Sequence, residues 1–165
     1  MRPSALRFLT AACLLLAGPA LANFDTRPVD RLSIGDGLSN DSVNAMAVDA
    51  QGFLWIATED GLNRFDGQQF EPYRRDEIDP ASIADNFVTA LLAEGDSLYV
   101  ATRTGSVQRL DLQRERFESL PPAIATTLEG NPVDDLVLVG PRHVLAGSRA
   151  SGLAAFRFDP AGAVQ

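Results

Sequence analysis

Two residues in the C-terminal third are of types that could support hydrolytic chemistry. His143 is the single histidine of the chain, and a Ser–His–Asp triad would need a nucleophile placed against it. Ser148 lies five residues further on, but no motif around it indicates a nucleophile. We therefore expect His143 to be a turn residue beside Pro141 and Arg142.

Metal and nucleotide sites are not predicted either. A zinc site needs three or four Cys or His ligands, and no Gly-rich segment follows a strand and opens a helix as a nucleotide loop does. Calcium remains an alternative because it prefers carboxylates, although no D-x-D-x-D-G loop occurs. We predict no catalytic residue, no cofactor and no metal ligand. The carboxylates expected at turns are Asp36, Asp41, Asp49, Asp60, Asp66, Asp96 and Asp111.

The best candidate for a ligand surface is an acidic stretch between two repeats. Asp76, Glu77 and Asp79 lie in the segment 74–80, which we expect to be a loop. Loops on one face of a rigid scaffold often carry binding sites, and solvated charge is the alternative explanation. Trp55 is expected in the core rather than stacked on a sugar, because its strand is apolar on both faces. The ligand-binding residues themselves stay unknown.

Residues 1–22 are typical of a secretory signal peptide. Arg2 and Arg7 precede an uncharged apolar run, and Ala20-Leu21-Ala22 fits a small-x-small cleavage site. A lipoprotein at Cys13 is disfavoured because Thr10, not Leu, stands three residues before it. Cleavage after Ala22 would remove the only cysteine, so disulfides cannot stabilise the exported chain.

Composition excludes further classes of protein. The chain has 165 residues, 45% hydrophobic, and a formal net charge of −8. Such a composition is not that of a disordered chain, and an acidic chain without a basic run does not favour nucleic acid as a partner.

The rest of the chain repeats itself with a period of about 45 residues. Val88 lies 45 residues after Val43, and Val133 lies 45 after Val88. In the first copy we expect strands at 43–48, 53–58, 62–65 and 68–73, separated by Gly-containing turns. Repeats of about 40–45 residues with four strands are typical of β-propeller blades. A β-sandwich with chance self-similarity is the alternative.

The first copy resembles a known family. The segments Gly37-Leu38-Ser39, Gly52-Phe53-Leu54-Trp55-Ile56-Ala57-Thr58 and Asp60-Gly61-Leu62-Asn63-Arg64-Phe65-Asp66-Gly67 are similar to the two-component regulator propeller repeat. The second copy departs from it, with Tyr99 in place of Trp, and the third is weaker. The resemblance implies an all-β fold, periplasmic blades of four antiparallel strands, and an output domain across the membrane that is a histidine kinase or a diguanylate cyclase.

The expected organisation is a signal peptide at 1–22, a clasp strand and linker at 23–41, and a partial propeller at 42–165. The blades are expected at about 42–75, 86–121 and 132–165. The strand Val29 to Ile34 would complete the outer edge of a last blade. Because propellers have roughly four to eight blades, three cannot close, and we interpret the chain as a fragment without its output domain.

Two functional classes are compatible with these features. The first is the periplasmic ligand-sensing part of an inner-membrane signalling protein, which is not itself an enzyme. The second is a free periplasmic propeller, either an enzyme such as a glycan lyase or a scaffold. The expected partners are an unidentified small molecule or glycan, the remaining blades and output domain of the same polypeptide, and a second copy in a homodimer; nucleic acid is not expected.

Overall fold

The computed structural model describes residues 31–119, 128, 130–140 and 143–157. After a 3-10 turn, η1 (Ile34–Asp36), eleven strands follow one another. They are β1 (Val43–Val48), β2 (Leu54–Thr58), β3 (Gly61–Phe65), β4 (Phe70–Tyr73), β5 (Val88–Glu94), β6 (Ser97–Thr102), β7 (Val107–Asp111), β8 (Arg116–Ser119), β9 (Asp135–Leu138), β10 (His143–Ser148) and β11 (Gly152–Arg157). Within the described part of the chain, no helix has the length and apolar character needed to cross a membrane.

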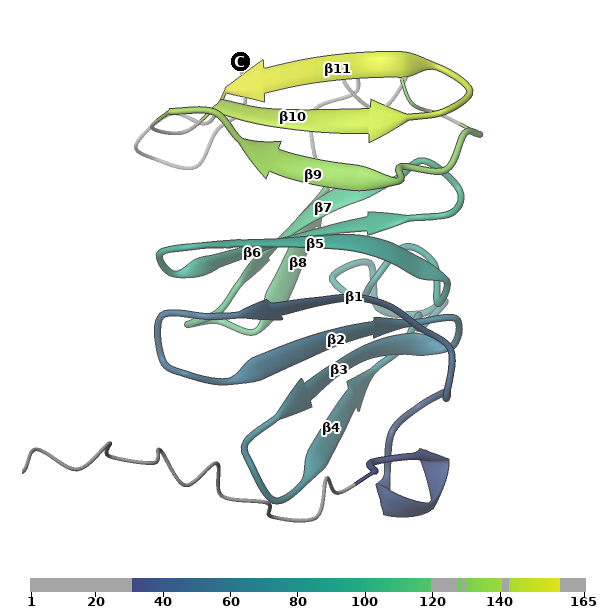
Figure 1. The fold of residues 1–165 in the computed structure, drawn as a ribbon, viewed down its shortest axis with the longest axis vertical. Coiled ribbons are helices and arrows are strands. Elements are labelled where there is room, and N and C mark those ends of the chain that lie inside the picture. Colours follow the sequence, from purple (N-terminus) through teal and green to yellow (C-terminus); the bar gives the residue numbers. More distant parts are fainter. Residues whose placement is uncertain (1–30, 120–127, 129, 141–142, 158–165) are drawn as a thin grey trace, which may run out of the picture. The chain divides into compact units, whose positions relative to one another are not determined.

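The strands form three antiparallel sheets in chain order (Figure 1). Sheet 1 is β1-β2-β3-β4, sheet 2 is β5-β6-β7-β8, and sheet 3 contains β9, β10 and β11 in its described part. Each strand pairs with the next one along the chain, so every sheet is a meander. The sheets approach each other through their first strands, since β5 contacts both β1 and β9. The predicted fold class, all-β with propeller blades of antiparallel strands, is confirmed.

Each sheet has two faces of different character. We call the face toward the next sheet the forward face; in sheet 1 it carries Ala45, Ala47, Trp55, Ala57 and Leu62. The opposite, rear face of sheet 1 carries Met46, Val48, Leu54, Ile56 and Phe65. This division follows from the two-residue alternation of side chains along a strand.

Two hydrophobic cores join the sheets, and each contains one forward face and one rear face. Between sheets 1 and 2, the forward face of sheet 1 packs on the rear face of sheet 2, formed by Leu91, Ala93, Leu98, Val100, Leu110 and Phe117. Between sheets 2 and 3, the forward residues Ala90, Leu92, Tyr99, Ala101 and Val107 meet the rear residues Leu136, Val144, Ala146, Ala154 and Phe156. The blades are therefore held by the same kind of interface, used twice.

The segment before each of the first two sheets is fixed by an amide side chain. Asn63 is fully buried on β3; its Oδ1 accepts a hydrogen bond from the backbone N–H of Ser39 at 2.9 Å. At the equivalent position of β7, Gln108 Oε1 accepts from the backbone N–H of Ala84 at 2.7 Å. Sheet 3 has Ala154 at this position, opposite Ala146. An amide in the sheet thus fixes the entering chain in two blades of the three.

Most predicted strands lie within two residues of the observed ones, but the predicted start of the outer strand of sheet 1 was wrong. Gln68 and Gln69 belong to the hairpin turn rather than to the outer strand, because both backbone N–H groups donate to Asp66 Oδ1. The described residues 31–34 of the predicted clasp are not paired in a sheet, and the pairing of residues 29–34 with a last blade stays a prediction. Here Ser33 caps η1 and Ile34 donates its N–H to Asp41 Oδ1, so the chain turns instead of extending. The signal peptide, residues 23–30 and the end of the third blade lie outside the described residues.

Candidate functional site

The structure does not bring His143 and Ser148 together. They occupy opposite ends of β10, about 16 Å apart at the usual rise per strand residue. His143 is therefore a strand residue, not the turn residue that we expected. Ser148 Oγ accepts hydrogen bonds from the N–H groups of Ala150 and Ser151, so its oxygen stabilises a turn.

Trp55 lies in the core, as predicted, with 1% of its surface exposed. Its indole Nε1 donates to Asp49 Oδ2 at 2.8 Å, and Asp49 Oδ1 accepts from the N–H groups of Gln51 and Phe53. One buried carboxylate therefore stabilises both the β1–β2 turn and the tryptophan. Among the described residues, no group of three or more Asp, Glu, His or Cys could hold a metal ion.

The acidic loop borders a cavity of about 310 Å³, to which Asp76, Glu77 and Asp79 all contribute. Two of these carboxylates are engaged in the loop itself: Asp76 Oδ1 accepts from the N–H of Ile78, and Asp79 Oδ1 from that of Ala81. Gln108 of β7 also fixes the loop, because its Nε2 donates a hydrogen bond to the carbonyl oxygen of Ser82. The cavity is thus a shallow polar site on an ordered loop.

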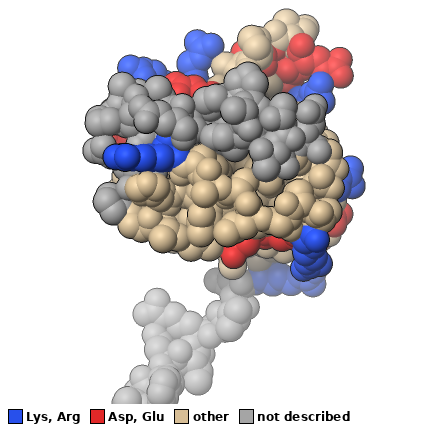
Figure 2. All heavy atoms as spheres, turned by 90° about the horizontal axis from the view of Figure 1, so that it is seen from above, with Lys and Arg blue, Asp and Glu red and all other residues tan. Residues whose placement is uncertain are grey.

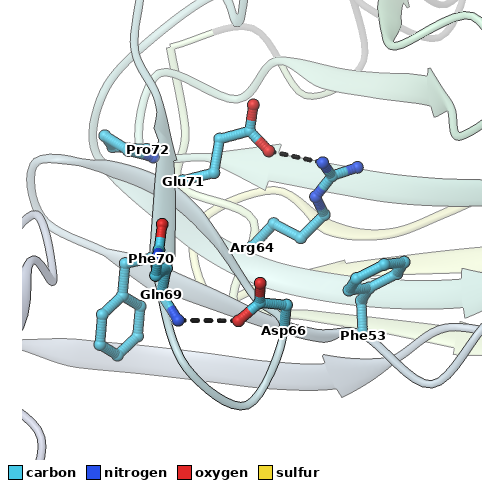
Figure 3. A pocket seen from close by; sticks show the side chains of 7 residues that line it. All are labelled: Phe53, Arg64, Asp66, Gln69, Phe70, Glu71 and Pro72. Carbon is cyan, nitrogen blue, oxygen red and sulfur yellow. Dashed lines mark hydrogen bonds and ion pairs between the residues drawn. The ribbon is translucent and has the colours of Figure 1, made fainter.

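A second cavity, of about 520 Å³, lies at the β3–β4 hairpin of sheet 1 (Figure 3). We call it the rim notch. Arg64 and Glu71 point toward each other across it, and the ring of Phe53 lies beside them (Figure 3). Its lining residues are Phe53, Arg64, Asp66, Gln69, Phe70, Glu71 and Pro72.

Arg64 is the centre of charge in the rim notch. Its guanidinium pairs with Glu71 at 2.6 Å in its own sheet and with Glu115 of sheet 2 at 2.8 Å. It also lies over the rings of Phe53, at 5.0 Å, and Trp55, at 6.0 Å. Burial acts to lower the pKa of Arg64, but Tyr73, Glu115 and Glu71 together raise it above its usual value. The arginine therefore connects two neighbouring sheets while 24% of its side chain stays exposed.

A related cavity of about 380 Å³ recurs in sheet 2 around Arg109. Arg109 pairs with Glu118 on the adjacent strand, as Arg64 does with Glu71. Asp111 accepts from the N–H groups of Gln113 and Arg114, as Asp66 does from Gln68 and Gln69. This recurrence indicates that the Arg–Glu pair and the Asp turn belong to the repeat itself.

Two ionisable groups in or near the rim notch have a shifted pKa. Hydrogen bonds from the N–H groups of Gln69 and Gln68 lower the pKa of Asp66. Tyr73 follows Pro72 on β4 but does not line the notch; burial raises its pKa to about 12, and its ring packs between Trp55 and Phe117. Neither shift moves its group toward neutral pH, where a general acid or base works best. What the notch offers a ligand is a guanidinium, carboxylates, an amide and an aromatic ring.

The rim notch was not predicted from the sequence. Its signal was present, because Arg109 follows Arg64 by 45 residues and Glu118 follows Glu71 by 47. No spacing in the sequence indicates that Arg64 pairs with Glu115, because this pair depends on how sheet 2 stacks on sheet 1.

The stacked antiparallel sheets define the chain as a run of β-propeller blades, and comparisons with known proteins agree. The family model described as "Two component regulator propeller" matches residues 37–60, from the segment before β1 through β2. This match over residues 37–60 confirms the predicted resemblance to that repeat.

Relatives of the chain belong to signalling systems. The extracellular domain of BT3049, assigned to a hybrid two component system of B. thetaiotaomicron, is 27% identical with a TM-score of 0.66 over 82% of this chain. The extracellular domain of BT4673 from the same organism is 19% identical with a TM-score of 0.60 over 79% of this chain, which shows the fold alone. Histidine kinase P4 of Formosa agariphila is 49% identical over 49 residues, or 30% of this chain.

The chain corresponds to a small part of each relative. It covers 19% of the BT3049 chain, 17% of the BT4673 chain and 4% of histidine kinase P4. The similarity is thus to a short stretch of each of these proteins, which in BT3049 lies within the extracellular domain.

Proposed function

We propose that this chain is the ligand-sensing propeller portion of a membrane-bound two-component sensor, exported to the periplasm. The observation that carries the proposal is the similarity to the extracellular domain of BT3049, which extends over 82% of this chain at 27% identity. The charged N-terminal start and the Ala20-Leu21-Ala22 site support export.

A kinase output is the version of the proposal that the comparisons favour. The curated relative is a histidine kinase, whereas support for a diguanylate cyclase output comes only from the wider resemblance. On this proposal the output domain and further blades belong to the longer protein, which spans the inner membrane.

The rim notch is the ligand site that we propose within this portion. Its guanidinium and carboxylates can exchange hydrogen bonds with a polar small molecule or a glycan, and Phe53 offers an apolar surface. Arg64 also pairs with Glu115 of the next sheet. A ligand that competes for Arg64 would weaken this inter-sheet pair, and its differential affinity for two packings would shift their populations.

Export is tested by fusing residues 1–165 to alkaline phosphatase, which is active only outside the cytoplasm, and expressing the fusion in a Gram-negative host. We expect activity and cleavage after Ala22, read by N-terminal sequencing. The matched control lacks residues 1–22 and should be inactive. An inactive full fusion would defeat the periplasmic assignment.

The signalling role is tested in the source gene. Sequencing past codon 165 should reveal further repeats, an apolar stretch of about 20 residues and a kinase domain. A reading frame that encodes blades and no such stretch would favour the free periplasmic propeller instead.

A further inference from the structure

The rim notch holds more negative charge than its arginine can balance. Asp66 and Glu71 line the notch together with Arg64, and Glu115 reaches the same guanidinium from sheet 2. One positive and three negative groups leave a formal net charge of −2 at pH 7. The side chains of Glu71 and Glu115 are 53% and 51% exposed, so both carboxylates can meet a ligand.

The related cavity of sheet 2 holds a second cation that the rim notch lacks. Arg114 pairs with Asp111 at 3.0 Å, and both line that cavity together with Arg109. Asp66 is the equivalent of Asp111 in sheet 1, and its Oδ1 accepts hydrogen bonds from two backbone N–H groups. Asp66 makes no ion pair with an arginine among the described residues. A ligand could supply the missing positive charge.

Glu115 holds a backbone conformation that its residue type disfavours. Its φ is +54°, and within the described part of the chain it is the only residue other than glycine with a positive φ. This left-handed conformation strains a residue with a Cβ and is usually taken by glycine or asparagine. Residues held in such conformations cluster at functional sites. The turn by itself would favour glycine, so the glutamate indicates a role for its carboxylate.

The aromatic ring in the rim notch also favours a cation. Phe53 lies 5.0 Å below the guanidinium carbon of Arg64, and the face of an aromatic ring attracts positive charge. The side of the molecule formed by β9–β11 differs: Figure 2 shows a broad uncharged area there, with charged side chains mostly around it. That side offers a charged ligand few partners, whereas the notch offers carboxylates and a ring together.

We propose that the ligand of the rim notch carries a protonated amine, held by Glu115 together with Glu71 and Asp66. An ammonium group donates three hydrogen bonds, and hydrogen bonds between charged groups are the strongest of their kind. Such a cation competes with Arg64 for Glu115 and therefore acts on the inter-sheet pair. The inference rests on the proposed function, in which the notch is the ligand site, and it disfavours an acidic sugar.

NMR titrations of the intact exported protein at low ionic strength test the proposal, with the Nε–H signals of Arg64 and Arg109 as local reporters. Glucosamine and putrescine supply amines, whereas N-acetylglucosamine is neutral and glucuronate is anionic. We expect glucosamine to shift the Arg64 signal, leave the Arg109 signal in place, and bind about tenfold more tightly than the neutral and anionic sugars. Added salt should weaken this binding. Putrescine, which has no sugar ring, separates an amino-sugar site from a general amine site, and the amine inference holds for both.

Glu115→Gly separates ligand binding from structure. Glycine relieves the left-handed strain, so this variant should unfold at the same temperature as wild type or a higher one. Its affinity for glucosamine should nevertheless fall about tenfold, because a charged acceptor is lost. Glu118→Gln, which alters the glutamate of the sheet 2 cavity, is the control and should bind glucosamine as wild type does. An unchanged affinity in Glu115→Gly would overturn the inference.

The probes also separate failure of this inference from failure of the proposed ligand site. Tighter binding of glucuronate, with a shift at Arg64, would overturn the amine and keep the rim notch as the site. An amine that binds without a shift at Arg64 would overturn the notch itself. Absence of binding by all four probes would overturn the amine inference.

Discussion

Where sheet 1 buries Trp55 against sheet 2, sheet 2 buries Tyr99 against sheet 3. The two aromatic residues hold equivalent register positions, each opposite an arginine on the next strand. Trp55 is fixed by a hydrogen bond to the buried Asp49, a position that Glu94 takes in sheet 2. Sheets 1 and 2 therefore both place a large ring at this point, sheet 3 has Leu145 there, and the polar group behind the ring varies.

The rim notch of sheet 1 and the related cavity around Arg109 of sheet 2 also share some features and differ in others. Both are lined by an arginine that pairs with a glutamate on the adjacent strand and by an aspartate that stabilises the hairpin. Only the notch of sheet 1 has Phe53 under its arginine and Glu115 reaching in from the next sheet, among the described contacts. We expect the features that both sheets share to serve the scaffold. Features found in one sheet alone are the better candidates for a specific function.

The largest effect is expected from Trp55, because it fills the core between sheets 1 and 2. Trp55→Ala should destabilise the domain by about 3–5 kcal/mol, the usual range for a buried aromatic residue. Trp55→Phe, which keeps a ring and leaves Asp49 without its indole partner, should cost about 1–3 kcal/mol. Denaturant unfolding followed by circular dichroism measures both values.

The fluorescence of the wild-type protein reports on Trp55 because the chain has no other tryptophan. Its emission should be blue-shifted. A red-shifted, freely quenched emission would place Trp55 at the surface.

A smaller effect is expected at Gly105, in the β6–β7 turn. Its φ is +84°, and an added Cβ would lie 2.1 Å from the carbonyl oxygen of Leu128 and 2.8 Å from that of Asn131. Gly105→Ala should cost about 3 kcal/mol, from left-handed strain and overpacking together. At Gly67, φ is +98° but no atom lies within 4 Å of the added Cβ, so Gly67→Ala should cost about 1–2 kcal/mol. Equal unfolding free energies for the two variants would contradict the close approach at Gly105.

The extent to which these features could be predicted depends on how local they are. The strands of sheet 1 follow from aromatic and β-branched residues and from glycine turns within one repeat, and the 45-residue spacing then predicts the blade of sheet 2. The clasp at Val29 to Ile34 stays a prediction because its partner blade is not part of this sequence; among the described residues, Ser33 and Asp36 form a capped turn. The Arg64–Glu115 pair joins positions 51 residues apart, and only the stacking of two sheets brings them together.

The amides that fix the entering chain should show an intermediate effect. Asn63→Ala leaves the backbone N–H of Ser39 without its acceptor, and Gln108→Ala does the same to Ala84. Each should cost about 1–3 kcal/mol, the range for an unsatisfied buried donor. Hydrogen exchange at the Ser39 and Ala84 amides should accelerate in the corresponding variant only. Gln68→Ala, at an exposed turn position, is the control and should stay within about 0.5 kcal/mol of wild type; comparable losses in all three variants would contradict the anchoring role.

The smallest effect on stability, and the most informative about function, is expected at the two arginines. Double-mutant cycles with Arg64→Met and Glu115→Gln, and with Arg109→Met and Glu118→Gln, should give coupling energies of about 0.2–1 kcal/mol, since both pairs are partly exposed. Addition of salt should reduce both couplings.

If the rim notch of sheet 1 binds the ligand, Arg64→Met should abolish the signalling response of the full-length protein, whereas Arg109→Met should preserve it. Equal loss of response in both variants would assign the arginines to the scaffold, and an unchanged response in Arg64→Met would direct the search to the acidic loop, where Asp76→Asn provides the corresponding variant.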